Sequence, residues 1–273
     1  PTSSEISGLS VHGPLARTVR DAAALLDAMA GPTSQDWIWQ APPATSFLAA
    51  CDDEPRGLRI GRYITPAVDG AEISPEARAA YDHASALLEQ LGHSVEDHEP
   101  TFSADLIPLF ETVWAVEFAA LPFPQEAEPG MRPLTRWLRE RGRAASSVEF
   151  YSALSGLRGH ARTELERTAA YDAVLTPTIA QPPALVGGLR NDADPALDFD
   201  NQKRFTPFTA PYNMSGQPAV SIPLHWSSVE EGGDDLPIGI QLIGRPGDEV
   251  TLLRLAAQIE AAEPWAHRKP ACW

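Results

Sequence analysis

Polar side chains in two loops are the groups best placed to bind a ligand. Thr178 and Ile179 follow a short apolar stretch, residues 173–177, which is predicted to be a buried strand. In α/β sheets, ligands bind where such strands end. Asn213 opens a polar turn in front of the next apolar stretch, where it either caps the turn or contacts a ligand. Tyr212 beside it combines an apolar ring with a polar tip.

The histidines and cysteines do not form a metal-binding pattern. His93 and His98 lie five residues apart in a strand-like stretch, with two carboxylates between them. A metal site there is one interpretation, and a polar edge exposed to solvent is the one that we favour. Cys51 and Cys272 are the two cysteines and lie far apart in the chain. Their number excludes a disulfide scaffold and indicates a reducing compartment, so we expect a cytoplasmic protein.

The bulk composition narrows the class of protein further. The chain has 273 residues, of which 37 are acidic and 21 are Lys or Arg, so its formal charge is −16. Such a surface repels phosphate backbones, and we expect no direct binding of nucleic acid. No run approaches the ~20 apolar residues that span a membrane. The sequence begins at Pro1 in a loop-like stretch, which we expect to be an interior point of a longer chain.

Hydrophobic periodicity predicts helices and strands in alternation. Helical spacing predicts helices over 16–30, 74–91, 102–120, 147–170 and 249–260, and short apolar or alternating stretches predict strands over 58–63, 93–98, 173–177, 219–223 and 238–243. Two stretches rich in Pro and polar residues, 121–133 and 180–200, are predicted to be loops, and 230–235 an acidic hairpin. The strand, helix, strand order at 58–98 is the building block of an α/β fold.

Four segments carry more information than the fold class. They are Ser10–Asp21 with the apolar stretch 24–31 behind it, Tyr171–Thr178, Phe208–Pro223 and Leu236–Pro246. Arg17 and Asp21 in the first segment are four residues apart at a predicted helix start, a spacing that favours an ion pair. Gly239 and Gly244 in the fourth indicate a bulge or the close approach of another segment.

In this order and spacing, the four segments resemble the amidase signature family over about Ser10 to Lys269. The third and fourth segments are most similar to bacterial amidases and nylon-oligomer hydrolases. The resemblance implies an α/β fold with a mixed sheet core flanked by helices, incomplete at the N-terminus. Residues 1–273 would then form the C-terminal portion of a single amidase domain. It also implies hydrolysis of a small carboxylic amide without a cofactor or a metal.

The chemistry of that family uses a serine nucleophile, a bridging serine and a lysine base, with the N–H groups of a Gly-Gly-Ser-Ser-Gly-Gly loop around the oxyanion. This run does not occur in the sequence, and the Ser-Ser pairs at 3–4, 146–147 and 227–228 have no flanking glycines. The two lysines, Lys203 and Lys269, do not match the catalytic position. We therefore expect no catalytic residue in this chain, and an N-terminal amidase segment that supplies all three.

The resemblance also implies a set of substrate-binding residues in this chain. They are Trp114, Thr178, Ile179, Phe208, Tyr212 and Asn213. A place in the core is the alternative for Trp114, and turn capping is the alternative for Asn213.

Two other functions remain open at this point. The chain is alternatively a catalytically inactive fragment or a subunit that acts by association, because loss of N-terminal strands should expose an apolar sheet edge. A second copy of the chain, in a homodimer, is one partner for that edge. The other alternative is the A subunit of a tRNA-dependent amidotransferase, in which a partner chain handles the RNA.

Overall fold

A computed structural model describes residues 6–32, 34, 41–100, 102–227 and 235–269. Helices and strands alternate along this part of the chain. They are α1 (Val19–Met29), α2 (Phe47–Ala50), β1 (Arg59–Arg62), α3 (Pro75–Gln90), β2 (Ser94–Asp97), α4 (Leu106–Ala120), the 3₁₀ helix η1 (Gln125–Gly130), α5 (Pro133–Ala144), α6 (Ser147–Thr168), β3 (Ala173–Pro177), α7 (Pro195–Phe205), α8 (Ala210–Ser215), β4 (Ala219–Ser227), β5 (Leu236–Gly244) and α9 (Glu249–Ala262).

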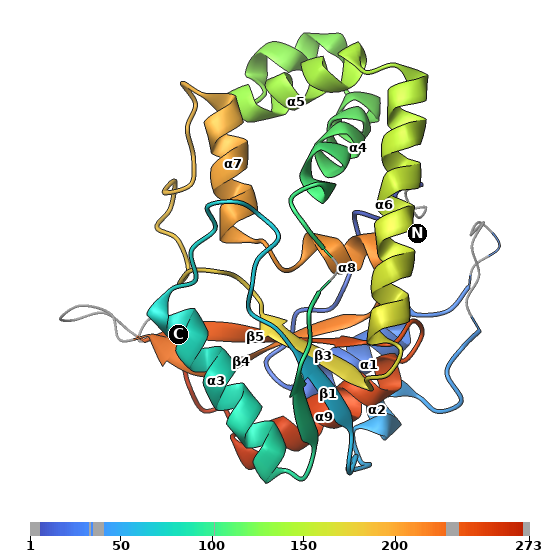
Figure 1. Ribbon diagram of the computed structural model, residues 1–273, viewed down its shortest axis with the longest axis vertical. Coiled ribbons are helices and arrows are strands. Elements are labelled where there is room, and N and C mark those ends of the chain that lie inside the picture. The colour runs from blue at the N-terminus through green and yellow to red at the C-terminus, as the bar shows by residue number, and fades with distance from the viewer. Residues whose placement is uncertain (1–5, 33, 35–40, 101, 228–234, 270–273) are drawn as a thin grey trace.

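The described strands form one mixed sheet with helices around it (Figure 1). Their order is β2-β1-β3-β5-β4, and β1 runs parallel to both β2 and β3. Strand β5 is antiparallel to β3 and to β4, and Gln241 in its middle pairs with Thr176 on one side and Ser221 on the other. These findings confirm the predicted α/β class and the mixed sheet flanked by helices.

One face of the sheet carries the larger core cluster. Ile238, Ile240 and Leu242 of β5 point to this face, as the period of two along a strand requires. They pack with buried residues of α3 and α9, and α1 and α2 complete the cluster through Val19 and Phe47. The alternate residue Ile243 belongs to the cluster on the opposite face.

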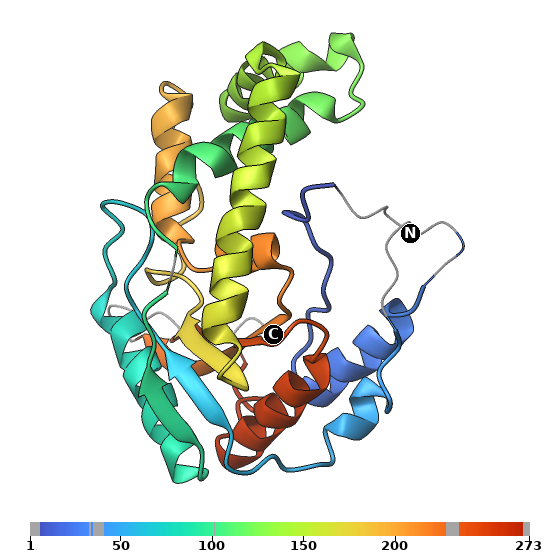
Figure 2. The same ribbon diagram turned by 45° about the vertical axis from the view of Figure 1, so that its right-hand side comes forward.

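The opposite face supports another group of helices. Figure 2 shows α6 and α7 rising from the sheet and α4 and α5 above it, while α1, α2 and α9 lie low on the molecule. Leu157 of α6, Tyr212 and Met214 of α8, and Val113 of α4 form the second core cluster with Ile243. Farther from the sheet, α4, α5 and α7 share a third cluster. A layer of helices thus covers this face of the sheet.

Local sequence signals explain where the longer helices begin. Ser74 caps α3 by accepting a hydrogen bond from the Ala77 N–H, and proline follows it at the first helical position. Ser146 and Glu149 form a capping box at the start of α6. The predicted helices at 74–91, 147–170 and 249–260 are therefore confirmed within a few residues.

Several predicted boundaries are wrong. Helix α4 begins at Leu106 rather than at 102, η1 occupies part of the predicted loop 121–133, and α7 begins within the predicted loop 180–200 and extends beyond it to Phe205. The predicted polar turn at Asn213 is instead the helix α8, which ends at Gly216 in the left-handed conformation that glycine adopts without strain. The predicted acidic hairpin at 230–235 falls almost wholly outside the described residues.

Two predicted polar features also differ in the structure. Arg17 precedes α1, whose N-cap is Thr18, and its guanidinium donates hydrogen bonds to the carbonyls of Ala266 and Arg268 instead of lying in the first helical turn. His93 and His98 are buried, which the favoured interpretation did not anticipate. The stretch between them is β2, an edge strand of the described sheet on which Ser94 and Asp97 are exposed, so the polar edge itself is confirmed. Within the described ranges, no helix combines the length and the hydropathy needed to cross a lipid bilayer.

Candidate functional site

Two hydroxyl groups meet at the C-terminal end of β3. The Oγ1 of Thr178 lies 2.7 Å from the Oγ of Ser221 on β4, and the Thr178 N–H donates to the Gly239 carbonyl of β5. A Cβ atom at Gly239 would lie 2.8 Å from Ser221 Oγ and 2.9 Å from Thr178 Oγ1. Glycine is therefore required there for the two hydroxyls to meet. The close approach predicted at Gly239 is confirmed. Ser221 was not predicted, because nothing in the residues around it indicates that Thr178 lies beside it.

The loop after β3 is fixed to the helices on both sides of it. The Ala180 N–H donates to the Phe205 carbonyl at the end of α7, and the Ala180 carbonyl accepts from the Ser74 N–H at the start of α3. Ala180 itself is fully buried, while Thr178 and Ile179 are partly exposed. These bonds hold Thr178 and Ile179 at the strand end where the sequence placed them.

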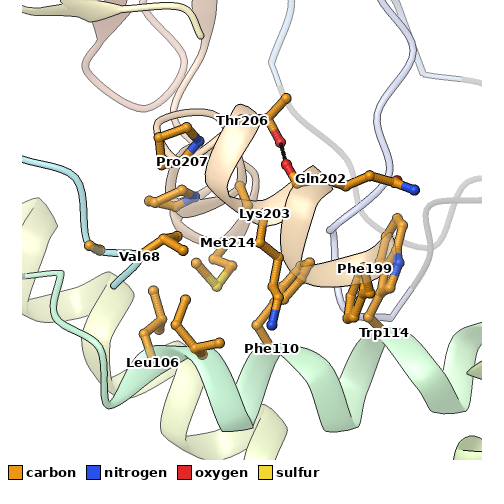
Figure 3. A pocket seen from close by; sticks show the side chains of 14 residues that line it. Val68, Leu106, Phe110, Trp114, Phe199, Gln202, Lys203, Thr206, Pro207 and Met214 are labelled. Carbon is orange, nitrogen blue, oxygen red and sulfur yellow. Dashed lines mark hydrogen bonds between the residues drawn. The ribbon is translucent and has the colours of Figure 1, made fainter. Parts of the chain in front are cut away.

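A pocket of 160 Å³ opens between α4, α7 and α8 (Figure 3). Apolar side chains dominate its lining. The lining residues are Ala67, Val68, Leu106, Ile107, Phe110, Trp114, Phe199, Gln202, Lys203, Thr206, Pro207, Ala210, Pro211 and Met214. A concave apolar site with few polar groups is the usual form of a small-molecule site. Trp114 thus packs against the core and also lines the pocket.

Aromatic rings line one wall of this pocket. The ring of Phe110 stacks on that of Trp114, with centroids 5.7 Å apart, and on that of Phe199, with centroids 6.3 Å apart. The interplanar angles are 20° and 22°, so the rings of Trp114 and Phe199 are each nearly parallel to that of Phe110. Two of them belong to α4 and the third to α7, which sequence reasoning had placed in a loop. The wall was therefore not predictable as a unit.

Lys203 brings a positive charge to the pocket, and its neighbours balance that charge. Its Nζ forms ion pairs with Glu111 and, at 2.7 Å, with Asp200. Its side chain is 10% exposed, and the ammonium lies 5.0 Å from the centre of the Phe199 ring. Arg141 approaches the other oxygen of Glu111 at 3.7 Å. Two cations and two carboxylates thus form one network beside the pocket.

Three of the predicted binding residues, which lie in α8 or shortly before it, are not among the lining residues. Phe208 and Tyr212 are each 1% exposed. The Tyr212 hydroxyl donates to the Tyr63 hydroxyl at 2.8 Å, and burial raises the pKa of both phenols. Asn213 donates from Nδ2 to the Leu9 carbonyl at 3.0 Å. These contacts fix α8, whose Ala210, Pro211 and Met214 line the pocket.

Gln241 links the strand end to the loop before α8. Its Nε2 donates to Thr176 Oγ1 at 3.2 Å and to the Phe208 carbonyl at 3.1 Å, and its side chain is buried. A buried amide must find such partners, so this residue fixes the spacing between β3 and the α8 entry. The sequence offered only its place in an apolar stretch, which did not indicate this role.

The histidines of the β2 region have protein partners. His98 Nε2 lies 3.2 Å from Glu164 Oε1, in a pair that is almost completely buried. His93 lies 3.2 Å from the Leu58 N–H through Nδ1 and 2.9 Å from Gln258 through Nε2. Over the part of the chain that the structure describes, no group of three His, Cys, Asp or Glu residues is arranged to hold a metal ion.

The amidase family model matches residues 4–253 of the chain. The 6-aminohexanoate-cyclic-dimer hydrolase of Pseudomonas sp. (strain NK87) is 31% identical over 284 residues, which cover 98% of this chain and 57% of that protein. The putative amidase AmiB2 of Mycobacterium bovis is 35% identical over 277 residues, covering 96% and 54%. The structure of 6-aminohexanoate cyclic dimer hydrolase complexed with substrate aligns with a TM-score of 0.82 at 28% identity, over 94% of this chain and 55% of that one.

The chain spans about half the length of the relatives that it matches. The family match extends over far more than half of the chain itself, and it includes the four segments that the sequence singled out. On this evidence, the chain belongs to the Amidase family.

Proposed function

We propose that this chain is the C-terminal portion of an amidase domain that hydrolyses a small carboxylic amide. It supplies part of the substrate pocket, and the serine nucleophile, bridging serine and lysine base lie in an N-terminal amidase segment outside it. The observation that carries the proposal is the apolar pocket between α4, α7 and α8, in a chain of this family that spans about half of its relatives.

The polar groups that the chain does contain support this division. Lys203 is held by Glu111 and Asp200, so its ammonium links α7 to α4 through ion pairs. Ser146 is occupied as the N-cap of α6. Such groups serve the fold, and a serine hydrolysis mechanism needs a base that is free to take a proton.

The predicted binding residues divide into two roles under this proposal. Trp114 contacts the substrate through the pocket wall. Thr178 and Ile179 are not among the lining residues, so they contact a part of the substrate that lies outside the pocket, at the end of β3. Phe208, Tyr212 and Asn213 act through α8, which they hold against the sheet and against Leu9. Positions of this kind are expected to affect substrate binding more than the chemical step.

The proposal extends to partners and location. The partner is the N-terminal amidase segment, and β4, at an edge of the described sheet, is one place for contact with it or with a second copy in a homodimer. The low cysteine count supports a cytoplasmic location. The relatives named above are a hydrolase and an amidase by name, which favours hydrolysis over the transfer of ammonia.

Release of amine or ammonia from neutral aliphatic and aryl amides tests this function. We expect hydrolysis by the whole protein and none by this chain alone when both are assayed at equal concentration. A circular dichroism spectrum of the chain alone serves as the control for folding. Turnover by the folded chain alone would contradict the division of catalytic and binding residues, and absence of turnover by the whole protein on every amide would contradict amide hydrolysis.

A further inference from the structure

We infer that the pocket between α4, α7 and α8 binds an uncharged apolar group about the size of a benzene ring. The existence of this binding site depends only on the pocket, whereas its use for the side group of an amide substrate rests on the proposed function. The inference follows from the volume, the lining and the charge balance of the pocket.

The volume of the pocket sets the size of its ligand. Apolar protein cavities of about 150 Å³ bind benzene. The pocket here has a volume of 160 Å³. A phenyl ring or a chain of about six carbons fills such a space. A larger group would have to remain partly outside.

The side chains of the lining favour a flat or slender group. The stacked rings of Phe110, Trp114 and Phe199 present an aromatic wall, against which another ring can stack or meet edge to face. Leu106 and Met214 also line the pocket, and the unbranched thioether of Met214 adapts to irregular ligands. This arrangement offers contact area rather than directional hydrogen bonds.

The polar lining groups already have partners within the protein. Thr206 Oγ1 donates to the Gln202 carbonyl at 3.1 Å, the hydrogen bond drawn in Figure 3. Gln202 Nε2 donates to Asp198 Oδ1 at 2.7 Å. A ligand that needs strong hydrogen bonds would have to compete with these contacts, so a polar ligand gains little in the pocket.

The charge balance around Lys203 selects against charged ligands. A carboxylate would have to displace Glu111 or Asp200 from the ammonium and would lose its own hydration. A cation in the pocket would lie close to the Lys203 ammonium and would be repelled by it. A neutral group suffers neither penalty, so the pocket is expected to discriminate by charge as well as by size.

Methionine methyl signals give a direct test with this chain. The chain has three methionines, Met29, Met131 and Met214, and Met214 alone among them lines the pocket. With [¹³C-methyl]methionine labelling, fluorobenzene is expected to shift the Met214 signal saturably and to leave the Met29 signal unchanged. The same concentrations of 4-fluorobenzoate and 4-fluorobenzylamine are expected to give no saturable shift. Met214→Leu assigns the signal.

Matched alanine substitutions separate binding in the pocket from binding elsewhere. Ala210→Leu fills the pocket and is expected to weaken fluorobenzene binding about tenfold or more. Ala86→Leu adds the same side chain to an exposed position of α3 and should leave binding unchanged. A saturable shift that Ala210→Leu does not weaken, or the lack of any saturable Met214 shift in the unaltered chain, would overturn the inference. If Ala210→Leu does not fold, the contact between fluorobenzene fluorine and the Met214 methyl, measured as a ¹⁹F–¹H Overhauser effect, decides the same point.

A second substitution tests the charge argument. Glu111→Gln with Asp200→Asn removes both carboxylates from Lys203 and is expected to make the pocket bind 4-fluorobenzoate, with fluorobenzene binding little changed. Unchanged rejection of the benzoate would contradict the role of the charge balance. If the protein bound fluorobenzene but hydrolysed no amide, the binding site would be correct and the proposed function wrong. If it hydrolysed amides but did not bind fluorobenzene in this pocket, the proposed function would stand and the binding site would be wrong.

Discussion

The hydroxyl of Tyr212 lies 2.8 Å from the hydroxyl of Tyr63, inside the core between α8 and the end of β1. The residue after β1 thereby anchors the short helix that supplies one side of the pocket. Phe102 meets the Tyr212 ring edge to face with centroids 5.8 Å apart, so the phenol is held by packing as well as by its hydrogen bond. The position of α8 thus depends on a contact between residues 149 apart in the chain.

This phenol pair makes stability depend on pH in the alkaline range. Burial raises the pKa of Tyr212 and of Tyr63, so the folded chain holds these protons more tightly than the unfolded one. The resulting stabilisation is fully present below about pH 10, the ordinary tyrosine pKa, and is lost as pH rises above it. Tyr212→Phe should cost about 1 kcal/mol at pH 8 and flatten the fall in unfolding free energy above pH 10. Urea titrations at several pH values measure both effects. Tyr151→Phe, on the exposed surface of α6, is the control. If the unfolding free energy of Tyr212→Phe fell above pH 10 as steeply as that of the unaltered chain, the pH dependence would not come from this phenol pair.

A glycine sets the distance between α4 and α5. A Cβ at Gly142 would overlap the Ala115 carbonyl and lie 2.8 Å from the Ala119 Cβ. Gly142→Ala should therefore destabilise the chain by about 3 kcal/mol or more, because backbone would have to move. Gly159→Ala in α6 meets no atom within 4 Å and should stabilise by about 0.5–1 kcal/mol. Denaturant midpoints at constant m-value compare the two, and a harmless Gly142→Ala would show that α4 and α5 are not packed this closely.

Ser146 should matter for folding and not for hydrolysis. Its side chain accepts from the Glu149 N–H, so Ser146→Ala is expected to cost about 1 kcal/mol in unfolding free energy. Its exposed neighbour Ser147 makes a suitable control, because Ser147→Ala leaves the cap in place. Amide hydrolysis by the whole protein should proceed at the unaltered rate in both variants. A large fall in kcat for Ser146→Ala would point to a catalytic role that we do not assign to it.

Lys203 should act as an electrostatic partner. Lys203→Met leaves the partly buried Glu111 with only the more distant Arg141 as a partner. It should lower the unfolding free energy by about 1–3 kcal/mol, because a buried polar group that loses its partner costs its desolvation penalty as well as the bond. The double variant Lys203→Met with Glu111→Gln removes both charges and should be closer to the unaltered chain. Thermal unfolding of the single and double variants tests this relation. A double variant less stable than either single one would contradict it.

The sequence anticipated the parts of this fold that local signals control. Ser74 with Pro75 marks the start of α3, and the apolar stretch 238–243 marks the buried part of β5. Helix α7 escaped prediction because Pro, Asn and Asp surround it, a composition typical of loops. It is stabilised instead by the burial of Phe199 and of Asp198, whose carboxylate accepts hydrogen bonds from Arg132 and the Asn191 N–H. Tertiary contacts of this kind outweigh local propensity.

The candidate site was predictable to the same extent. Thr178 follows from its place after a buried strand, and Trp114, one of the predicted binding residues, lines the pocket, while its contact with a substrate stays a prediction. The hydroxyl contact with Ser221 depends on strand register and on the missing side chain at Gly239, and neither is visible as a local pattern. The ammonium of Lys203 reaches the pocket only because α7 is a helix. The prediction therefore failed where partners distant in the chain determine the position of a group.

The most direct test of the account is the position of the serine that reacts as the nucleophile. A fluorophosphonate probe reacts with an activated serine and leaves a stable adduct, whose site is found by peptide mass spectrometry of the whole protein. We expect one dominant adduct, on a serine outside residues 1–273. Changing that serine to alanine should abolish both the adduct and amide hydrolysis. A dominant adduct within these residues, on Ser146 or Ser221 for example, would contradict the claim that this chain provides binding groups while the catalytic groups lie elsewhere.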